Sequence, residues 1–352
     1  REDPGNKSRL RTDKGQQALT APPLTDSSIL NRGLTTMKYI TALFITLVLA
    51  GELMPSLSAA AVKDHPFEKV AENTWVIHGP LEMPNPENQG FMNNPGLVLT
   101  SAGAVIIDPG SSVQSGEMVL RMLKAVTDKP VVAVFNTHIH GDHWLGNQAI
   151  KAIFPDAPVY GHTEMLAMVE DGAGDHWVEL MDKLTEGATK GTRVVGPDHA
   201  LKPGDTITVG NKTFRIHHFG QAHTRTDIMI EVTEDGVIFL GDNVTAERIP
   251  RMTDGNFTGN INSVDSILKI SANTWVPGHG PTGDTAMVRA YRDFLAAVYA
   301  SAKQAFDEGM DSSDVKPIAL KATVKYRDWA GYESEIGPQG AQAYMEVEAA
   351  EF

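Results

Sequence analysis

The decisive stretch of this chain reads Asn136-Thr137-His138-Ile139-His140-Gly141-Asp142-His143-Trp144-Leu145-Gly146-Asn147. It follows the apolar run Val131–Asn136, which is typical of a buried strand, so we expect a strand end, a loop and then a helix start. His138 and His140 are two residues apart and can face the same side of an extended backbone. After a turn, Asp142 and His143 can reach a second position beside the first. Imidazole and carboxylate form a ligand set that suits zinc.

Three further candidate ligands follow strand-like runs elsewhere in the chain. His223 comes after Thr213–Phe219, Asp242 directly after Val237–Leu240, and His279 shortly after Thr274–Val276. A single loop histidine is more often a surface or capping residue than a ligand. Glycines within three residues of each of them let the backbone approach a common centre closely. Together with the first four side chains, they indicate a metal centre.

This order of residues, H-x-H-x-D-H followed by a separate His, Asp and His, resembles the metallo-β-lactamase superfamily, and the resemblance covers Phe67 to Pro281. It implies an α/β fold, an αββα sandwich whose metal site lies at one edge between two sheets. By position, His138, His140 and His223 would hold a first metal. The implied ligands of the second metal are Asp142, His143 and His279, with Asp242 bridging both. The turn Ile107-Asp108-Pro109-Gly110 resembles the family's first motif, in which the acid supports the ligands.

Such a site predicts an enzyme that activates water. Two divalent ions, zinc by default with iron and manganese tolerated by the same ligands, can bridge one water and lower its pKa towards about 7. Asp142 is the candidate catalytic residue, placed to orient the resulting hydroxide and to shuttle its proton. We therefore expect a hydrolase of a carbonyl bond, first of all in a β-lactam or a lactone.

Other functions stay open at this point. The chain has no cysteine, whereas the best-known antibiotic-degrading subclass places one in its second site. His143 with Asp242 resembles the glyoxalase II and lactonase branches, so a glyoxalase II-like thioester hydrolase is the first alternative. His143 without cysteine also fits the histidine-rich lactamase subclass. A mononuclear iron oxygenase acting on sulfur compounds, or a non-catalytic metal carrier, is the alternative of a different class.

The amino-acid composition limits the kinds of molecule that this chain is expected to bind. The 352 residues carry a formal net charge of -14, with 44 acidic against 30 basic side chains. This balance disfavours non-specific binding to nucleic acid, which needs a basic surface, so a nuclease ranks last. We expect a small-molecule substrate. The sequence leaves the oligomeric state open.

The chain divides into four segments that differ in composition and in apolar periodicity. Residues 1–36 are polar and aperiodic, and we expect a disordered upstream extension there. Residues 37–60 read as a signal peptide, because Met37-Lys38 precedes a dozen apolar residues and Ser58-Ala59-Ala60-Ala61 offers small residues. We therefore expect an exported protein, periplasmic or secreted, that has no stable membrane insertion after cleavage. The catalytic domain is predicted over 61–283 and a helical extension over 284–352.

Within the catalytic domain, the expected strands and helices are given by apolar periodicity. The remaining strands are expected at Thr74–His78, Gly96–Thr100, Ala104–Asp108, Thr206–Val209 and Ile228–Val232. The helices are expected at Gln114–Val126, Thr163–Leu184 and Ser263–Ala272, and in the extension at Asp284–Glu308 and Ser312–Tyr326.

Several residues near the motif have two interpretations each. The loop Gly79–Pro95 is a surface loop or a lid that covers the site with Met83 and Met92. Trp144 is a core anchor or a pocket wall. His176-Trp177 lies at a surface helix kink, which we favour, or reaches the substrate. Arg248 is an anion-binding residue or part of a solvated loop. Asn147 and Asp227 are expected to support the ligands.

Overall fold

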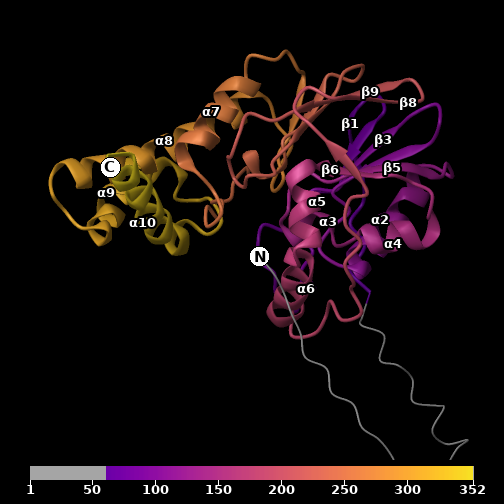
Figure 1. Cartoon of the computed structure of the whole chain (residues 1–352), viewed down its shortest axis with the longest axis horizontal. Coiled ribbons are helices and arrows are strands. Elements are labelled where there is room, and N and C mark those ends of the chain that lie inside the picture. The colour runs from indigo at the N-terminus through magenta and orange to yellow at the C-terminus, as the bar shows by residue number, and fades with distance from the viewer. Residues whose placement is uncertain (1–60, 352) are drawn as a thin grey trace, which may run out of the picture. The chain divides into compact units, whose positions relative to one another are not determined.

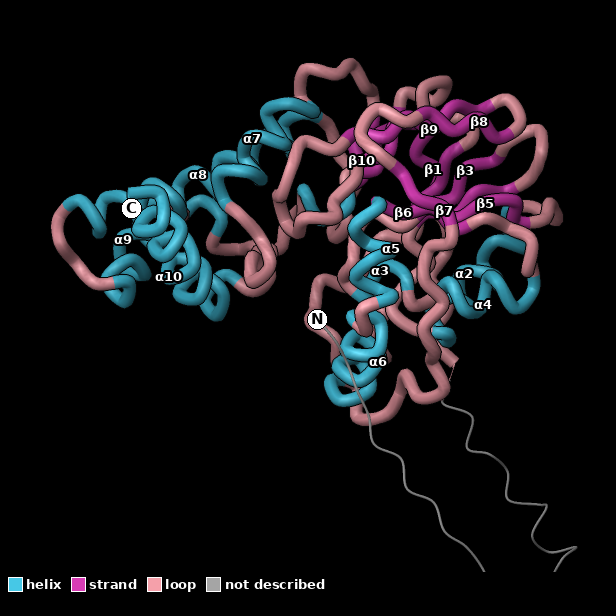
Figure 2. The backbone as a smooth tube through the Cα atoms, in the orientation of Figure 1, coloured by secondary structure: helices cyan, strands magenta, loops and turns pink. Residues whose placement is uncertain are grey.

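The computed structural model describes residues 61–351, so the expected upstream extension (1–36) and signal peptide (37–60) lie outside the described residues. The described part contains two β-sheets with helices beside them (Figures 1 and 2). None of its helices is long and apolar enough to cross a membrane.

The larger sheet has seven strands that follow one another in chain order. Its first four strands pair antiparallel, and the pairs from β4 to β7 are parallel. The strands are β1 (Glu68–Ala71), β2 (Thr74–Val76), β3 (Gly96–Leu99), β4 (Ala104–Ile107), β5 (Val131–Phe135), β6 (Val159–His162) and β7 (His199–Leu201).

The smaller sheet has five strands in the order β12-β11-β10-β9-β8. The pair β11–β12 is parallel and the other pairs are antiparallel. The strands are β8 (Thr206–Val209), β9 (Lys212–His217), β10 (Met229–Val232), β11 (Val237–Phe239) and β12 (Thr274–Val276).

Helices occupy the connections and the C-terminal part. The α-helices are α2 (Val113–Val126), α3 (Gly141–Trp144), α4 (Asn147–Ile153), α5 (Thr163–Glu170), α6 (Ala173–Leu184), α7 (Phe257–Ile267), α8 (Thr285–Asp307), α9 (Val315–Ala322) and α10 (Tyr332–Glu351). Short 3-10 helices lie at η1 (Gly241–Asn243), η2 (Ser312–Asp314) and η3 (Val324–Tyr326).

The two sheets pack face to face, because alternate side chains of each strand point to opposite faces. In β4, Val105 and Ile107 belong to a core between the sheets, where Phe135 stacks on Phe214 with ring centroids 5.0 Å apart. Ile106 points the other way, into a second core that includes side chains of α2 and α4. The larger sheet is therefore apolar on both faces, as a sheet covered by helices must be.

The smaller sheet is covered on its outer face by α7 and α8. Ile238 and Trp275 of this sheet lie in one buried cluster with Phe257 of α7 and Phe294 of α8. The layers thus run helix, sheet, sheet, helix. The predicted αββα sandwich with a helical C-terminal extension is confirmed.

Some boundaries and elements differ from the expectation. The single helix expected over Thr163–Leu184 is two helices, because Gly172 adopts a left-handed conformation (φ 96°) between α5 and α6. Helix α7 begins earlier than expected, since the Asn256 side chain accepts a hydrogen bond from Gly259 N and caps it. Strands β1, β6 and β7 and helices α4 and α10 were not predicted, whereas α3 is the helix start that was expected after the loop of the motif.

The helical extension shares its core with the catalytic part. Val315 of α9 and Ile336 of α10 belong to the same buried cluster as Trp275 of β12. The Glu346 carboxylate of α10 also accepts hydrogen bonds from the backbone N–H groups of Phe257 and Thr258, at the start of α7. The boundary at residue 283 stays a prediction, and no separate core marks it among the described residues.

Candidate metal centre

Strand ends deliver all the predicted ligands to one place. The loop after β5 carries His138 and His140 and leads into α3, which holds Asp142 and His143. The others lie after β9, β11 and β12; they are His223, Asp242 in η1, and His279.

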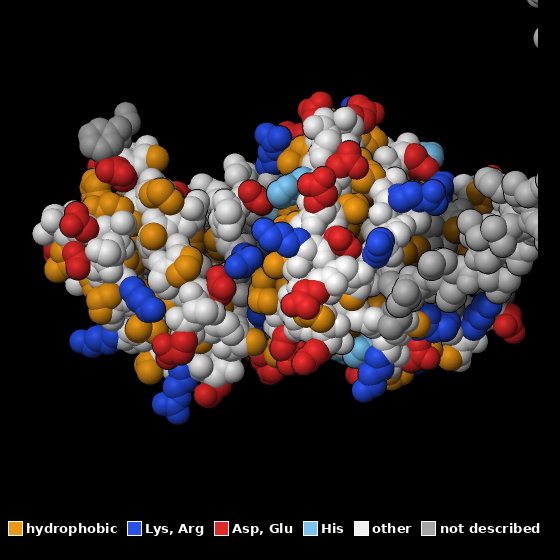
Figure 3. Space-filling view, turned by 90° about the horizontal axis from the view of Figure 1, so that it is seen from below, with side chains coloured by type: hydrophobic (Ala, Val, Ile, Leu, Met, Phe, Trp, Pro, Cys, Tyr) orange, Lys and Arg blue, Asp and Glu red, His pale blue; other side chains and the backbone are white. Residues whose placement is uncertain are grey.

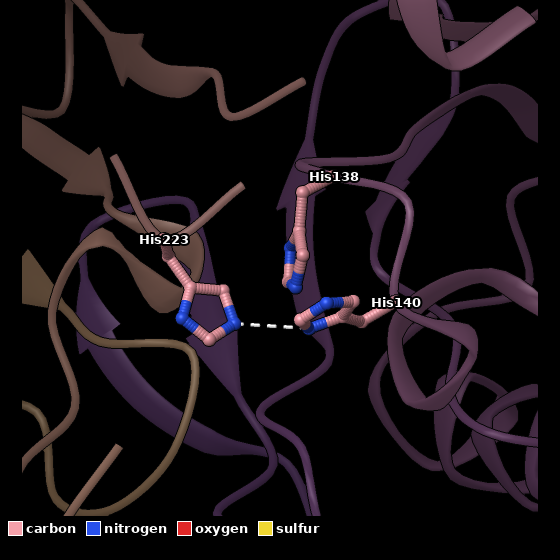
Figure 4. A group of neighbouring side chains, drawn as sticks. All are labelled: His138, His140 and His223. Carbon is pink, nitrogen blue, oxygen red and sulfur yellow. Dashed lines mark hydrogen bonds between the residues drawn. The ribbon is translucent and has the colours of Figure 1, made fainter. Parts of the chain in front are cut away.

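The seven side chains form three overlapping groups whose ligand atoms lie within 4.8 Å of one another. One group is His138, His140 and His223, whose rings converge in Figure 4. The other two groups are His138, His143 and Asp242, and Asp142, His143 and His279. The structure thus brings together every side chain that the sequence proposed as a ligand.

Asp242 lies between the two ends of this cluster. One carboxylate oxygen, Oδ1, is 3.2 Å from His143 Nε2. The other, Oδ2, is 3.5 Å from His223 Nε2 and 3.3 Å from His279 Nε2. Asp242 thus lies within 3.5 Å of imidazoles from both ends of the cluster. Gly278 makes this position accessible, because a Cβ there would lie 1.9 Å from Asp242 Oδ1.

Asp108 orients two of the imidazoles. Its Oδ2 accepts hydrogen bonds from His143 Nδ1 at 2.8 Å and from Thr137 Oγ1 at 2.6 Å. Because the Thr137 hydroxyl donates to Asp108, it accepts from His138 Nδ1, 3.0 Å away. Both histidines therefore carry a proton on Nδ1, and both Nε2 atoms point into the cluster. The supporting role expected of Asp108 has a geometric basis.

Two more imidazoles are fixed in the same manner. His140 Nε2 donates to Asp254 Oδ2 at 3.0 Å, which leaves Nδ1 facing His223 Nε2 at 2.9 Å. His279 Nδ1 donates to Met92 O at 2.8 Å, which leaves Nε2 facing His143 Nε2 at 3.3 Å. Lone pairs that face each other at such distances repel unless a proton or a cation lies between them.

The donor set fits divalent ions. Within residues 61–351, His138 Nε2 and Asp242 Oδ1 are buried and have no hydrogen-bond partner. Buried polar atoms normally have a partner, so these two atoms call for a ligand. In the other histidines of the cluster, the ring nitrogen that faces away from it has a hydrogen-bond partner. His223 differs, because its Nδ1 has no such partner among the described residues.

The histidines of the cluster differ in the direction in which their pKa values are shifted. Burial, above all, lowers the pKa of His138 well below its ordinary value and that of His223 to about 3, so both stay neutral as metal ligands must. Burial also acts to lower the pKa of His143, but the neighbouring carboxylates, Asp242 foremost, raise it well above its ordinary value. Burial would raise the pKa of Asp142, yet His143 and His279 hold it below its usual range.

Asn147 and Asp227, which were expected to support the ligands, form hydrogen bonds with the segments that carry them. Asn147 and Asn136 exchange side-chain hydrogen bonds, which brace the end of β5 just before the motif. Asp227 accepts from Thr224 N and Oγ1 at 2.6 and 2.9 Å and so shapes the loop that carries His223. Burial raises the pKa of the Asp227 carboxyl to about 7.

A cavity of about 830 Å³ opens beside the cluster. His140, Asp142, His223, Asp242 and His279 line it. The loop before β3 contributes Met83, Pro84 and Met92, so it forms part of the wall; its movement as a lid stays a prediction. Trp144 is fully buried and donates from Nε1 to Ile139 O, which makes it a core anchor.

The placement of His176-Trp177 at a surface kink was wrong. Helix α6 runs through both residues, and its break lies earlier, at Gly172. Both side chains line the cavity, and the Trp177 ring lies 4.9 Å from the His140 ring.

Arg248 lies in the wall of the cavity and is not solvated, since only 6% of it is exposed. Its Nη1 is 3.0 Å from His279 Nδ1, and its Nη2 contacts the Met83 sulfur. Within the described residues, no carboxylate lies within ion-pair distance of this guanidinium. A buried arginine without a paired acid beside a cavity is suited to an anionic group of a ligand.

Two functional side chains escaped the sequence analysis. Thr137 lies inside the motif and links Asp108 to His138, and its position two residues after the strand was the only available signal. Asp254 holds His140 from a distant loop without a recognisable pattern.

Comparison with known proteins agrees with this geometry. The family model of the metallo-β-lactamase superfamily matches residues 88–279, more than half of the chain. The chain belongs to this superfamily. The match extends from the loop before β3 to the last candidate ligand, His279.

Curated relatives are hydroxyacylglutathione hydrolases. The protein from Cyanothece sp. is 28% identical over 177 residues, which are 49% of this chain and 57% of the relative. That of Trichormus variabilis is 30% identical over 178 residues, again 57% of the relative. The match thus spans little more than half the length of these relatives.

Solved structures share the fold at low identity. A metallo-β-lactamase from Pontibacter korlensis aligns with a TM-score of 0.53 at 20% identity, covering 66% of this chain and 99% of that protein. The stereoselective inverting sec-alkylsulfatase Pisa1 from Pseudomonas sp. aligns with a TM-score of 0.63 at 15% identity, covering 80% and 50%.

Proposed function

We propose that this chain is a dinuclear metal-dependent hydrolase that cleaves a carbonyl bond. His138, His140 and His223 hold one divalent ion. Asp142, His143 and His279 would hold the second, and Asp242 would serve both ions. The observation that carries this proposal is the convergence of seven candidate ligand side chains, six of them buried and His140 half-buried, around the buried and partnerless atoms His138 Nε2 and Asp242 Oδ1. Zinc is the ion that fits three imidazoles best, and iron or manganese fits the same ligands.

When bound, the two ions supply Lewis acidity and a water molecule whose pKa is lowered towards about 7. The remaining work falls to the chain. Asp142 lines the cavity with its carboxylate kept ionised, so it can orient the attacking water and accept its proton. Arg248 lies on the same cavity and offers a fixed positive charge to a negatively charged group of the substrate or to the oxygen that gains charge during the reaction.

Among carbonyl substrates, a β-lactam or a lactone remains the first proposal. A thioester is the second candidate, and it is favoured by the hydroxyacylglutathione hydrolases among the relatives. Both substrate classes place an activated carbonyl where water must attack, so one dinuclear site serves either.

The alternatives from other classes have less support. A mononuclear iron oxygenase or a metal carrier would use only part of the ligand set and would leave either His138 and His140 or His143 and His279 without a function. A nuclease would need a basic surface. Figure 3 shows acidic and basic side chains interspersed on the face that it displays, over residues that the structure describes.

The test is a hydrolysis panel with the purified metal-loaded chain: a chromogenic cephalosporin, an acyl-homoserine lactone and an acylglutathione thioester. We expect chelator-sensitive turnover of at least one of them and its loss in His140→Ala. The matched control is His199→Ala, which removes an exposed histidine of β7 outside the cluster. Failure to hydrolyse any of the three by a chain that holds two ions would contradict the proposed reaction.

We also propose that residues 37–60 direct export. The support is their sequence pattern of a positive start, an apolar run and small residues. Expression of the whole chain in a Gram-negative host, followed by fractionation and intact-mass measurement, tests this proposal. A periplasmic product that has lost these residues is expected, and a cytoplasmic product of unchanged mass would contradict it.

A further inference from the structure

One wall of the cavity beside the candidate metal centre is apolar, and helix α6 supplies most of it. Trp177, Leu180, Met181 and Leu184 all line the cavity. Their spacing of three and four residues places them on one stripe of the helix. Met168 of α5 extends the same wall.

Only part of this wall packs against the protein core: Met181 belongs to a buried cluster against which Met168 and Trp177 pack, whereas Leu180 and Leu184 lie outside it. Only Met181 among these side chains is fully buried, while Met168, Trp177 and Leu180 are half-buried. Leu184 is 39% exposed, and Met83, which also lines the cavity, is 36% exposed. They are two of only seven large apolar residues that stay exposed within residues 61–351, and both line this one cavity. Clustered exposed apolar side chains mark a binding surface.

The apolar wall begins at the reacting centre. The Trp177 ring lies 4.9 Å from the ring of His140. From Trp177 to Leu184 the helix rises by about 10 Å, at about 1.5 Å for each residue. A flexible group that starts at the metal centre therefore meets apolar surface along two turns of α6.

We propose that this wall, formed by Met168, Trp177, Leu180, Met181 and Leu184 and called the α6 wall below, binds an unbranched apolar acyl chain, so that the substrate is an amphiphilic acyl compound. The chain lies along α6 with its carbonyl at the metal centre. The reacting bond rests on the proposed function, whereas the binding of the chain does not. Burial of each methylene is worth about 0.8 kcal/mol, which is up to about fourfold in affinity.

The experiment measures binding without turnover. Straight-chain carboxylates from acetate to decanoate are titrated by calorimetry into the metal-loaded full chain. In the wild type, affinity is expected to rise with chain length by up to about fourfold for each methylene, until the chain passes Leu184. The double variant Leu180→Gln/Leu184→Gln is expected to flatten this rise, because polar amides replace the apolar surface.

The matched control is Ile153→Gln, which makes the same kind of change at an apolar residue that is 63% exposed on α4 and does not line the cavity. It should keep the wild-type slope. Thermal melting checks the fold of each variant, and Met168→Gln replaces the double variant if that variant does not fold.

An affinity that is independent of chain length in the wild type, or an unchanged slope in the variants of the α6 wall, would overturn the proposal. Absence of hydrolysis together with a retained slope would count against the proposed function alone, because the titration needs no reaction.

Discussion

Asp108 illustrates how single residues prepare this site. It adopts a left-handed backbone conformation (φ 50°), which is uncommon for a residue with a side chain and marks a position held by its surroundings. Its carboxylate receives three donors: Thr137 N, Thr137 Oγ1 and His143 Nδ1. A carboxylate accepts on both oxygens, so all three donors are satisfied and the proton positions of His138 and His143 follow.

Asp108→Asn keeps the shape of this side chain but replaces one acceptor oxygen by a donor. His143 Nδ1 then loses its acceptor, and the tautomer with a proton on Nε2 becomes favoured, which cannot bind a metal. We expect metal affinity at the second site to fall by about 10- to 100-fold. Competition with a fluorescent zinc chelator measures this. Asp198→Asn, which alters an Asp–His pair outside the site, is the control, and equal losses in both variants would contradict the role of Asp108.

Arg248 gives a prediction about charge. Arg248→Met keeps an apolar stem beside Met83 and removes the guanidinium. Because charge-assisted hydrogen bonds contribute about 1.5–3 kcal/mol, we expect the preference for an acidic substrate over its amide to fall by tenfold or more, with Arg248→Lys in between. Competitive inhibition by a carboxylate and its amide measures the preference, with Arg327→Met, an exposed arginine of the extension, as control. An unchanged preference would contradict the proposed contact.

At this scale the sequence predicted which side chains converge, because the chemistry of candidate ligands is visible in the residue types. Histidine and aspartate at short spacing, or directly after apolar runs, can be recognised as candidate metal ligands from the sequence alone. Asp254 could not be found in this way, since it lies 114 residues from His140 and only the fold brings them together. The prediction for His176 and Trp177 was wrong because it depended on where the helix breaks. The sequence offers Gly172 and Gly174 for this break, and only the structure shows that it occurs at Gly172.

At the scale of elements, Asp235 joins the two sheets. It lies in the turn between β10 and β11, and it accepts hydrogen bonds from Thr74 Oγ1 at 2.7 Å and from Lys212 Nζ. Thr74 belongs to the larger sheet and Lys212 to the smaller one. The side chains of Asp235 and Lys212 are only 1% and 5% exposed. This buried pair fixes the strand ends of both sheets at the edge next to the β1–β2 turn.

Asp235→Asn should therefore destabilise the fold. Removal of one partner from a buried ion pair costs about 3–5 kcal/mol, because the other charge stays buried. Burial alone would raise the pKa of Asp235, but the hydrogen bonds from Lys212 and Thr74 lower it below the ordinary 3.8. The stabilisation is thus present above pH 3.8 and is lost as the pH falls through the lower value of the folded state.

Urea unfolding of wild type and Asp235→Asn at neutral and at acidic pH measures this difference. The gap in the free energy of unfolding should be large at neutral pH and should narrow in acid. Glu234→Gln, the exposed neighbour, is the control. A gap that does not depend on pH would contradict the ion-pair explanation.

Elements with strong apolar patterns were predicted, and weak ones were not. Strand β8 and strand β12 have the predicted bounds, Thr206–Val209 and Thr274–Val276. Strand β7 was missed because it is three residues long and mostly exposed, so it lacks an apolar pattern. Helix α10 was missed because Pro338 and two glycines interrupt its sequence, and its packing on α8 and α9 compensates for their low helix propensity.

At the scale of the molecule, the helical extension is bound to the catalytic part by a cap as well as by a core. Glu346 Oε2 accepts from Phe257 N at 2.6 Å, and Oε1 accepts from Thr258 N and Oγ1 at 2.9 and 2.7 Å. The two N–H groups lie in the first turn of α7 and have no acceptor within the helix itself. A negative charge is favourable at this end of a helix. Helix α7 follows directly on the loop that carries Arg248 and Asp254.

Glu346→Gln should cost about 1–2 kcal/mol, since it removes the charge from this cap and at least one acceptor. The midpoint of urea unfolding measures the loss, and Glu348→Gln, an exposed glutamate on the same helix, is the control. If the two substitutions have equal effects, the cap does not stabilise the junction.

The sequence predicted the sandwich but not how the extension joins it. The fold followed from the motif, because that motif accompanies one fold. The shared core could not be predicted, since the apolar stripe of α8 looks the same whether it packs on neighbouring helices or on a sheet. Here Phe294 contributes to a cluster that also contains Trp275 of β12.

The central claim is that seven side chains hold two divalent ions. Elemental analysis of the purified, dialysed chain tests it most directly, with His223→Ala and His279→Ala measured beside the wild type. We expect two ions for each wild-type chain, and about one in each variant, because each substitution removes a ligand from a different ion. A single iron in the wild type, or two ions retained in both variants, would contradict the account.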